Sequence, residues 1–166
     1  DILKGWDVSA TYNLTSYNGL KDILRKTITF VNPDNGETNR YQSPNSIKNI
    51  DYRNIQQTFI LQSNFDFHFG KHNLGGVVGM SQEWYTARMF EASRNNLSTE
   101  QEPTLSLGDP ETMSNDSGYS SWAIRSGFGR LSYNWNERYL LECNLRYDLS
   151  SRFHKDNRGG LFPSVS

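Results

Sequence analysis

Residues 139–148 read Tyr-Leu-Leu-Glu-Cys-Asn-Leu-Arg-Tyr-Asp, and this stretch decides the fold class. Its apolar positions are Tyr139, Leu141, Cys143, Leu145 and Tyr147. Its polar positions are Glu142, Asn144, Arg146 and Asp148. Because successive side chains of a β-strand point to opposite faces, the stretch predicts a strand with one apolar and one polar face. Leu140 alone departs from the alternation.

The same alternation recurs along the chain and predicts an all-β protein built of antiparallel strands. The predicted strands are residues 4–17, 55–70, 73–87, 119–135, 138–149 and 160–166. In 119–135 the apolar set changes parity. It begins with Trp122, Ile124 and Phe128 and continues with Leu131, Tyr133 and Trp135. This change predicts a β-bulge near Gly127 or Gly129.

The connections between these strands alternate in length. Residues 18–54 and 88–118 are predicted to form long loops, whereas the turns around residues 70–73 and 134–137 are short. Within the first long segment, the turn residues Asn32 to Gly36 are compatible with a small hairpin over residues 27–40. Alternating short turns and long loops are typical of a transmembrane β-barrel, with the long loops on the external side.

Composition excludes several other classes. The 166 residues carry 17 Lys and Arg against 18 Asp and Glu, so no basic field is available for nucleic acid. Aromatic residues make up 13% of the chain although its mean hydropathy is −0.74. A single cysteine, Cys143, excludes an intrachain disulfide framework and is interpreted as a small apolar side chain. This combination fits strands with one apolar face, joined by polar loops.

Alternation alone does not distinguish an apolar face against lipid from one buried between two sheets. The aromatic residues at the predicted strand ends favour the membrane, because Trp and Tyr concentrate at its two interfaces. We predict these interfacial residues to be Trp6, Trp84, Trp122, Trp135, Tyr139 and Tyr147. The alternative is a soluble β-sandwich that binds carbohydrate, in which the apolar faces pack on each other.

In hydrocarbon every backbone hydrogen-bonding group needs a partner, so spanning strands must belong to a closed barrel. Six strands are too few, because eight is about the smallest common barrel. The prediction is therefore an antiparallel, up-and-down transmembrane β-barrel segment, about six strands of a larger barrel and not closed on its own.

Four segments, residues 128–133, 138–142, 146–153 and 160–166, closely resemble the barrel of the SusC/RagA family of TonB-dependent outer-membrane transporters. The hairpin segments 70–74 and 81–83 resemble an upstream part of the same barrel. The resemblance implies a barrel of about 22 strands around a plug. It also implies import of oligosaccharides or peptides across the outer membrane of a Gram-negative, Bacteroidetes-type bacterium. The partners implied are outer-membrane lipid, a SusD-like surface lipoprotein that acts as a lid, and TonB, reached through a plug region absent from these residues.

Candidate substrate contacts are few. By strand parity Arg146 and Asp148 face the lumen, and Arg152 follows in the adjacent external turn. They form either a charge network that ties the strand to its loop or direct contacts to a glycan or peptide substrate. Tyr41 and Tyr52 are predicted in the long loops, where recognition residues commonly lie. No nucleophile, catalytic dyad or metal-ligand spacing occurs, so we expect no enzyme activity, metal or cofactor.

Overall fold

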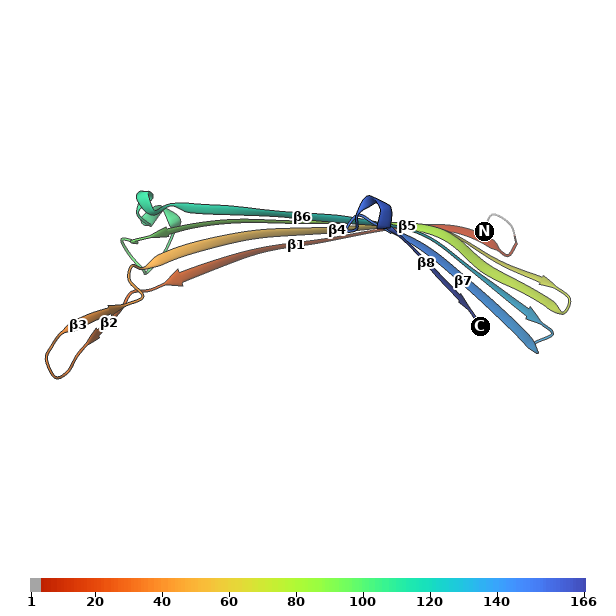
Figure 1. The fold of residues 1–166 in the computed structure, drawn as a ribbon, viewed down its shortest axis with the longest axis horizontal. Coiled ribbons are helices and arrows are strands. Elements are labelled where there is room, and N and C mark those ends of the chain that lie inside the picture. The colour runs from red at the N-terminus through yellow and green to blue at the C-terminus, as the bar shows by residue number, and fades with distance from the viewer. Residues whose placement is uncertain (1–3) are drawn as a thin grey trace. The chain divides into compact units, whose positions relative to one another are not determined.

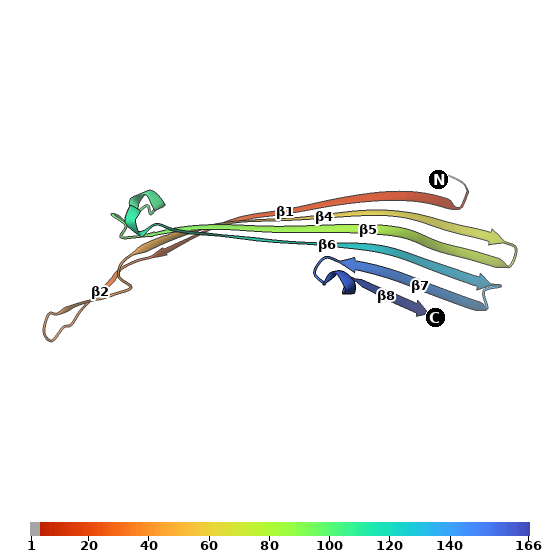
Figure 2. The same ribbon diagram turned by 45° about the horizontal axis from the view of Figure 1, so that its top comes forward.

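The computed structural model describes residues 4–166, which form one six-stranded sheet and a separate two-stranded hairpin (Figure 1). The six strands follow the order β1-β4-β5-β6-β7-β8, so neighbours in the chain are neighbours in the sheet once the hairpin β2-β3 is set aside. Their bounds are β1 Trp6–Arg25, β4 Ser46–Phe69, β5 His72–Asn95, β6 Ser114–Trp135, β7 Tyr139–Ser150 and β8 Gly159–Val165. The order is that of a meander, as the alternating pattern predicts (Figure 2).

Three short 3-10 helices complete the described residues. They are η1 Leu105–Leu107, η2 Pro110–Thr112 and η3 Lys155–Asn157. Within the part of the chain that the structure describes, no helix is long and apolar enough to cross a membrane.

Four strands are longer than the alternation predicts. β1 continues to Arg25 instead of ending at residue 17, and β4 begins at Ser46 instead of residue 55. β5 reaches Asn95 and β6 begins at Ser114, so the predicted loops 18–54 and 88–118 are largely strand. The sequence pattern misses these extensions because polar residues occupy both parities in each of them, so they show no apolar alternation.

The small hairpin in the first long segment is confirmed. β2 (Ile28–Val31) pairs antiparallel with β3 (Thr38–Tyr41), with Val31 opposite Thr38. The amide of Asn32 donates to the carbonyl of Glu37 at 2.8 Å, and Gly36 closes the turn with φ of 71°. Glycine populates this left-handed region without the steric cost that other residues pay.

The chain divides into two compact units, which we describe separately. Unit 1 contains the described residues up to Thr15, Ile55–Thr86 and Ser121–Ser166, and unit 2 contains Ser16–Asn54 and Ala87–Ser120. Unit 1 therefore includes all of β7 and β8 together with the parts of β1, β4, β5 and β6 next to the short turns. Unit 2 includes the remaining parts of those four strands with the two longest connections.

The register between β6 and β7 shows that the predicted bulge near Gly127 or Gly129 is wrong. Residues 124–135 pair one to one with residues 150–139 without interruption. Directly paired residues share a face of the sheet, so Phe128, opposite Arg146, lies on the polar face. Leu131, opposite Cys143, lies on the apolar face. The parity change comes from aromatic and aliphatic side chains on the polar face and not from an inserted residue.

The apolar face of unit 1 is exposed. Leu141, Leu145 and Leu161 leave about half or more of their surface uncovered, at 50%, 51% and 59%. Among the described residues the buried hydrophobic side chains are Ile47 and Leu97, and both belong to unit 2. No second sheet packs on the described part of this face, so the β-sandwich alternative is wrong.

Unit 2 is held together around Asn45. The amide of Leu97 donates to its side-chain oxygen at 2.8 Å, and its side-chain nitrogen donates to Glu100 Oε1 at 3.0 Å. The amide of Thr27 donates to the same carboxylate oxygen at 3.2 Å. The bonds from Asn45 and from Thr27, helped by the charge of Lys26, lower the pKa of the Glu100 carboxyl below its ordinary value, although slight desolvation opposes the shift.

Acid should weaken the hydrogen bonds that Asn45 and Thr27 donate to the Glu100 carboxylate. Since the pKa of Glu100 is lower in the folded protein, the contribution of its charge to stability is fully present above about pH 4.5, the ordinary pKa of the group, and is lost as the pH falls through the folded pKa. We expect hydrogen exchange around Thr27 in the full-length protein, corrected for the intrinsic pH dependence, to increase below pH 4.5. In Glu100→Gln that increase should disappear, whereas Glu102→Gln, a nearby exposed carboxylate, should behave as the wild type. An acid-induced increase that persists in Glu100→Gln would contradict the assignment.

Candidate functional site

Unit 1 presents a polar face whose side chains bond from strand to strand. Asn64 Nδ2 donates to Asp7 Oδ2 at 2.9 Å between β4 and β1, and Gln56 Nε2 donates to Glu83 Oε1 at 2.6 Å between β4 and β5. Ser132 Oγ donates to the carbonyl of Gly75 at 3.1 Å. These bonds extend the polar face across β1, β4, β5 and β6.

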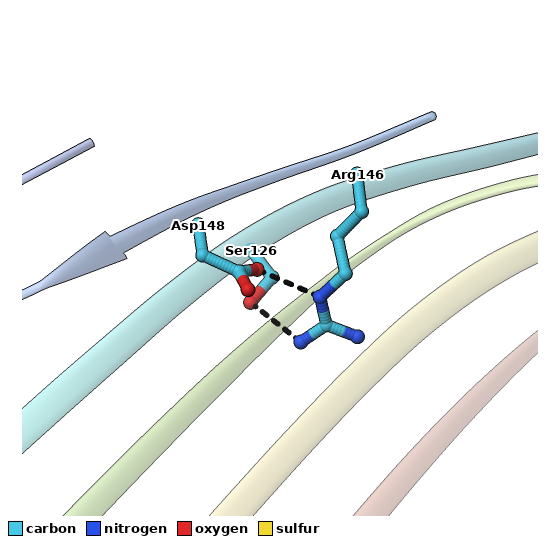
Figure 3. A network of polar contacts seen from close by, with 3 residues as sticks. All are labelled: Ser126, Arg146 and Asp148. Carbon is cyan, nitrogen blue, oxygen red and sulfur yellow. Dashed lines mark hydrogen bonds and ion pairs between the residues drawn. The ribbon is translucent and has the colours of Figure 1, made fainter. Parts of the chain in front are cut away.

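Arg146, Asp148 and Ser126 form a network on the same face (Figure 3). Arg146 Nε donates to Asp148 Oδ1 at 2.8 Å, and Arg146 Nη2 donates to Ser126 Oγ at 3.1 Å. Ser126 lies directly opposite Asp148 in the β6–β7 register, which brings the hydroxyl and the carboxylate to the same guanidinium. The side chain of Arg146 remains 51% exposed, so it can still contact a solute.

A hollow of about 480 Å³ lies beside this network. The residues that line it include Gln62, Asn64, Arg130, Asn144, Arg146 and Phe162. Two of these side chains are cationic, three are amides and one is aromatic. Amides and guanidinium groups bond to the hydroxyls of a sugar or to the carbonyls of a peptide, and an aromatic ring provides a stacking surface.

The ring of Phe128 packs against β5 at Gly79. A Cβ atom at Gly79 would stand 2.6 Å from the Phe128 ring and 2.8 Å from the carbonyl oxygen of Leu61. The absence of a side chain at residue 79 leaves the space that the Phe128 ring occupies. An aromatic group is thereby fixed on the polar face, next to the hollow.

Arg152 lies apart from the Arg146 pair. Its guanidinium stands 4.7 Å from the centroid of the Trp122 ring, and Trp122 stacks on Tyr85 at 5.4 Å. Trp122 has the strand parity of Ser126, which lies on the polar face. Strand parity thus no longer supports Trp122 as an interfacial aromatic. A ring with a cation above it is a platform suited to stacking and to hydrogen bonding.

The two tyrosines predicted in loops are strand residues. Tyr52 lies within β4 and stacks on Tyr17 of β1 at 6.0 Å between ring centroids. Tyr41 is the last residue of β3 and is exposed. The predicted candidates therefore form separate groups: Arg146 and Asp148 are paired with each other, while Arg152, Tyr52 and Tyr41 each have other surroundings. Their contact with a substrate stays a prediction.

Several of the predicted interfacial aromatics lie on the apolar face of unit 1. Trp135 and Tyr139 pair across the short turn and stack at 5.4 Å. Trp6 donates its Nε1 hydrogen to Ser63 Oγ at 2.5 Å. Trp84 and Tyr147 are exposed, and Tyr147 is paired with Leu161. Their position at a membrane interface stays a prediction.

Sequence reasoning missed Ser126, Tyr85 and Phe162 as members of the polar face. Ser126 is a small residue in a segment whose parity was misassigned, and Tyr85 lies on the polar parity of β5, where the pattern gave no reason to select it. Phe162 lies opposite Arg146 in the β7–β8 register. For Ser126 and Phe162 the signal that could identify them is pairing with β7, because the alternation of β7 is clear. Among residues 4–166, no group of His, Cys, Asp and Glu side chains is placed to hold a metal ion.

An open antiparallel sheet with one exposed apolar face and one hydrogen-bonded polar face defines this chain as a section of barrel wall. Residues 2–166 match the family described as TonB dependent receptor-like, beta-barrel. The chain belongs to this family of TonB-dependent receptors.

Similar curated proteins come from two bacteria. The TonB-dependent receptor SusC of Bacteroides thetaiotaomicron is 34% identical over 97 residues, covering 58% of this chain and 9% of SusC. The TonB-dependent receptor P26 of Formosa agariphila is 29% identical over 163 residues, covering 88% of this chain and 16% of P26. This chain thus spans less than a fifth of the length of these relatives.

The fold agrees with solved structures of RagAB, a peptide transporter. One of them matches with a TM-score of 0.83 at 22% identity, over 98% of this chain and 18% of the other. A RagAB structure in the closed-closed state matches with the same TM-score at 24% identity. At this level of identity the likeness shows the fold.

Removing the Arg146 side chain should change stability little. The pair it forms is half-exposed, and such pairs contribute about 0–1 kcal/mol. We expect Arg146→Ala in the full-length protein to lower the free energy of unfolding by no more than about 1 kcal/mol. Urea unfolding of the purified protein, with Arg138→Ala as the matched control, measures the effect. A loss of about 3 kcal/mol or more would show that the network is structural.

Charge should be tolerated on one face of β7 only. Leu145 lies on the apolar face and Asn144, its neighbour, on the polar face. A charged residue facing the middle of a bilayer costs about 2–4 kcal/mol, whereas one facing the lumen costs little. We expect Leu145→Arg to lower the unfolding free energy of the full-length protein in lipid by that amount, and Asn144→Arg to leave it nearly unchanged. Equal effects of the two variants would contradict the assignment of faces.

Proposed function

We propose that this chain is part of the wall of an outer-membrane importer for oligosaccharides or peptides. The observation that carries the proposal is the pair of unlike faces in unit 1: exposed leucines and aromatics on one side, bonded amides and charges on the other. Membership of the TonB-dependent receptor family supports it, since that family is one of outer-membrane barrels.

In this proposal the apolar face meets lipid acyl chains and the polar face lines the path of the substrate. Backbone groups within the sheet are paired strand to strand, which is the condition for crossing hydrocarbon. The strands β4 and β5 each have 24 residues, whereas about 9–11 residues cross a bilayer. Much of each strand therefore lies outside the membrane, and the hairpin β2-β3 belongs to that part.

Recognition in this proposal uses the hollow beside Arg146 and the platform formed by Trp122 and Arg152. Both consist of groups that bond to hydroxyls or amides and stack on flat surfaces, and neither has a reacting group. This composition supports binding and passage of a polar chain molecule. It gives no basis for enzyme activity.

The partners belong to the same proposal. Energy would come from TonB through a plug outside the present residues, and a SusD-like surface lipoprotein would cover the external opening. The similarity to SusC and to the RagAB structures supports both, together with the location in the outer membrane of a Bacteroidetes-type bacterium.

Uptake by cells tests the proposal. Cells that produce the full-length protein should accumulate a fluorescent oligosaccharide or peptide pool, and a strain lacking its gene or its proton gradient should not. Arg146→Ala should reduce uptake about tenfold or more, because a hydrogen bond from a guanidinium to a polar substrate contributes about 1.5–3 kcal/mol. Arg138→Ala, in the short turn, is the control and should leave uptake unchanged. Uptake that is the same with and without the gene would contradict the proposal.

A further inference from the structure

A second hollow in unit 1, of about 420 Å³, is lined by cations from separate parts of the chain. Arg125 comes from β6, while Lys155 and Arg158 come from the connection between β7 and β8 that contains η3. Gln82, Leu149 and Ser151 line it as well. None of the described residues that line this hollow is acidic. It plays no part in the polar face described above.

This cationic hollow opens on the apolar face. Arg125 is paired with Leu149, which has the parity of Tyr147, Leu145 and Leu141. Arg125 Nε donates to Gln82 Oε1 at 2.7 Å, and Gln82 Nε2 donates in turn to the carbonyl of Ile124 at 3.4 Å. An amide oxygen positions the guanidinium without neutralising its charge. Gln82, at 8% exposure, is the buried polar side chain that fixes the arrangement.

The connection that carries the other two cations is tied to the sheet. Ser151 N donates to the carbonyl of Ala123 at 2.9 Å, and Ala123 N donates to Ser151 Oγ at 2.8 Å. Ser150 N donates to the carbonyl of Arg158 at 2.9 Å. Arg158 Nε donates to the carbonyl of Phe153 at 3.1 Å. The backbone that carries Lys155 and Arg158 is therefore anchored beside Arg125.

The acidic side chains close to this connection have partners other than Arg125, Lys155 and Arg158. Asp156 lies 3.4 Å from His154 Nδ1, and Asp148 binds Arg146 on the opposite face. Within residues 4–166, neither Arg125 nor Lys155 nor Arg158 forms a salt bridge. Their positive charges remain available to an external anion.

The position of the hollow along the strands indicates that the anion is a lipid headgroup. From Tyr139, at the short turn, to Leu149 there are ten residue steps, or about 33 Å at 3.3 Å per residue. At a strand tilt of about 40° this corresponds to about 25 Å along the membrane normal, the height of the apolar band of such barrels. Leu149, and with it the cationic hollow, therefore lies near the outer limit of that apolar band, at the level of lipid headgroups.

We propose that Arg125, Lys155 and Arg158 bind the phosphate monoester of an external-leaflet lipid whose acyl chains lie along Leu145 and Tyr147. Arginine and lysine both bind phosphate, and arginine does so through paired N–H groups. Basic pockets next to an apolar protein surface bind anionic headgroups in the same way. The inference rests on the membrane placement in the proposed function. It adds a lipid site on the outside of the wall, separate from the substrate path.

Native mass spectrometry of the full-length protein in detergent tests the site. The probes are phosphatidic acid, which carries a phosphate monoester, and phosphatidylcholine and diacylglycerol with the same acyl chains. Wild-type protein should retain phosphatidic acid preferentially. The variant Arg125→Gln/Lys155→Gln/Arg158→Gln should bind it at least about tenfold more weakly, since each cation near an anionic lipid contributes about a factor of five.

The matched control removes the same charge elsewhere. Lys21→Gln/Arg25→Gln/Arg40→Gln replaces exposed cations of unit 2 and should retain phosphatidic acid as the wild type does. Both triple variants should show the β-sheet circular dichroism and heat-dependent gel migration of a folded barrel. If the triple variant does not fold, the single variant Arg125→Gln replaces it in the binding experiment. This variant should keep the fold and should bind phosphatidic acid more weakly than the wild type.

Three results would overturn the proposal. Equal retention of phosphatidic acid by the wild type and the cationic variants would show that these residues bind no headgroup. Inorganic phosphate that binds as tightly as phosphatidic acid and displaces it would show an anion site with no lipid component. Wild-type protein that stays in aqueous solution without detergent would overturn the proposed function as well as the lipid site. The first two results would overturn the lipid site alone, so the two kinds of failure are distinguishable.

Discussion

The structure depends on an apolar face that no part of the described chain covers. In water a leucine or aromatic side chain that is left exposed forgoes up to about 1.5–3 kcal/mol of burial. Many side chains on this face leave about half of their surface exposed. The buried hydrophobic side chains among the described residues, Ile47 and Leu97, belong to unit 2 and cannot compensate for unit 1. A surrounding of acyl chains removes this cost. It also explains why the backbone is organised as a continuous strand-to-strand ladder, because hydrocarbon offers no other hydrogen-bond partner.

The need to place apolar side chains on one face of the sheet also determines which side chains lie on its polar face. Once one parity of each strand is assigned to lipid, the other parity meets water and solute, and its side chains satisfy one another across strands. The Arg146–Asp148–Ser126 network and the Asn64–Asp7 bond are products of this sorting. The cationic hollow around Arg125 opens on the apolar face, and in the proposed membrane a charge on that face is stable only at the height of the headgroups.

The sequence predicts the architecture well where the two faces of a strand meet different media. Residues 139–150 are the clearest example, since predicted and observed bounds differ by a single residue at each end. Prediction fails where both faces are wet, as in β1 beyond residue 17, because polar residues then occupy both parities. It also fails where a large apolar side chain stands on the polar face. Phe128 and Trp122 are such cases, and only the register with β7 and the stack on Tyr85 reveal their side.

The most direct measurement is a nitroxide scan of residues 139–149 in the full-length protein, reconstituted in lipid. Each position is labelled in turn through a single cysteine, and Cys143 is replaced by serine in every variant except the one that is labelled at Cys143 itself. Spin-label collision rates would be compared for oxygen, which concentrates in hydrocarbon, and for a water-soluble nickel chelate. If the apolar face meets lipid, labels at Leu141, Cys143, Leu145 and Tyr147 should collide mainly with oxygen. Labels at Glu142, Asn144, Arg146 and Asp148 should collide mainly with the nickel chelate. If labels at Leu141 and Leu145 collide with neither oxygen nor the nickel chelate, another protein surface covers this face. That result would contradict the assignment of the face to lipid.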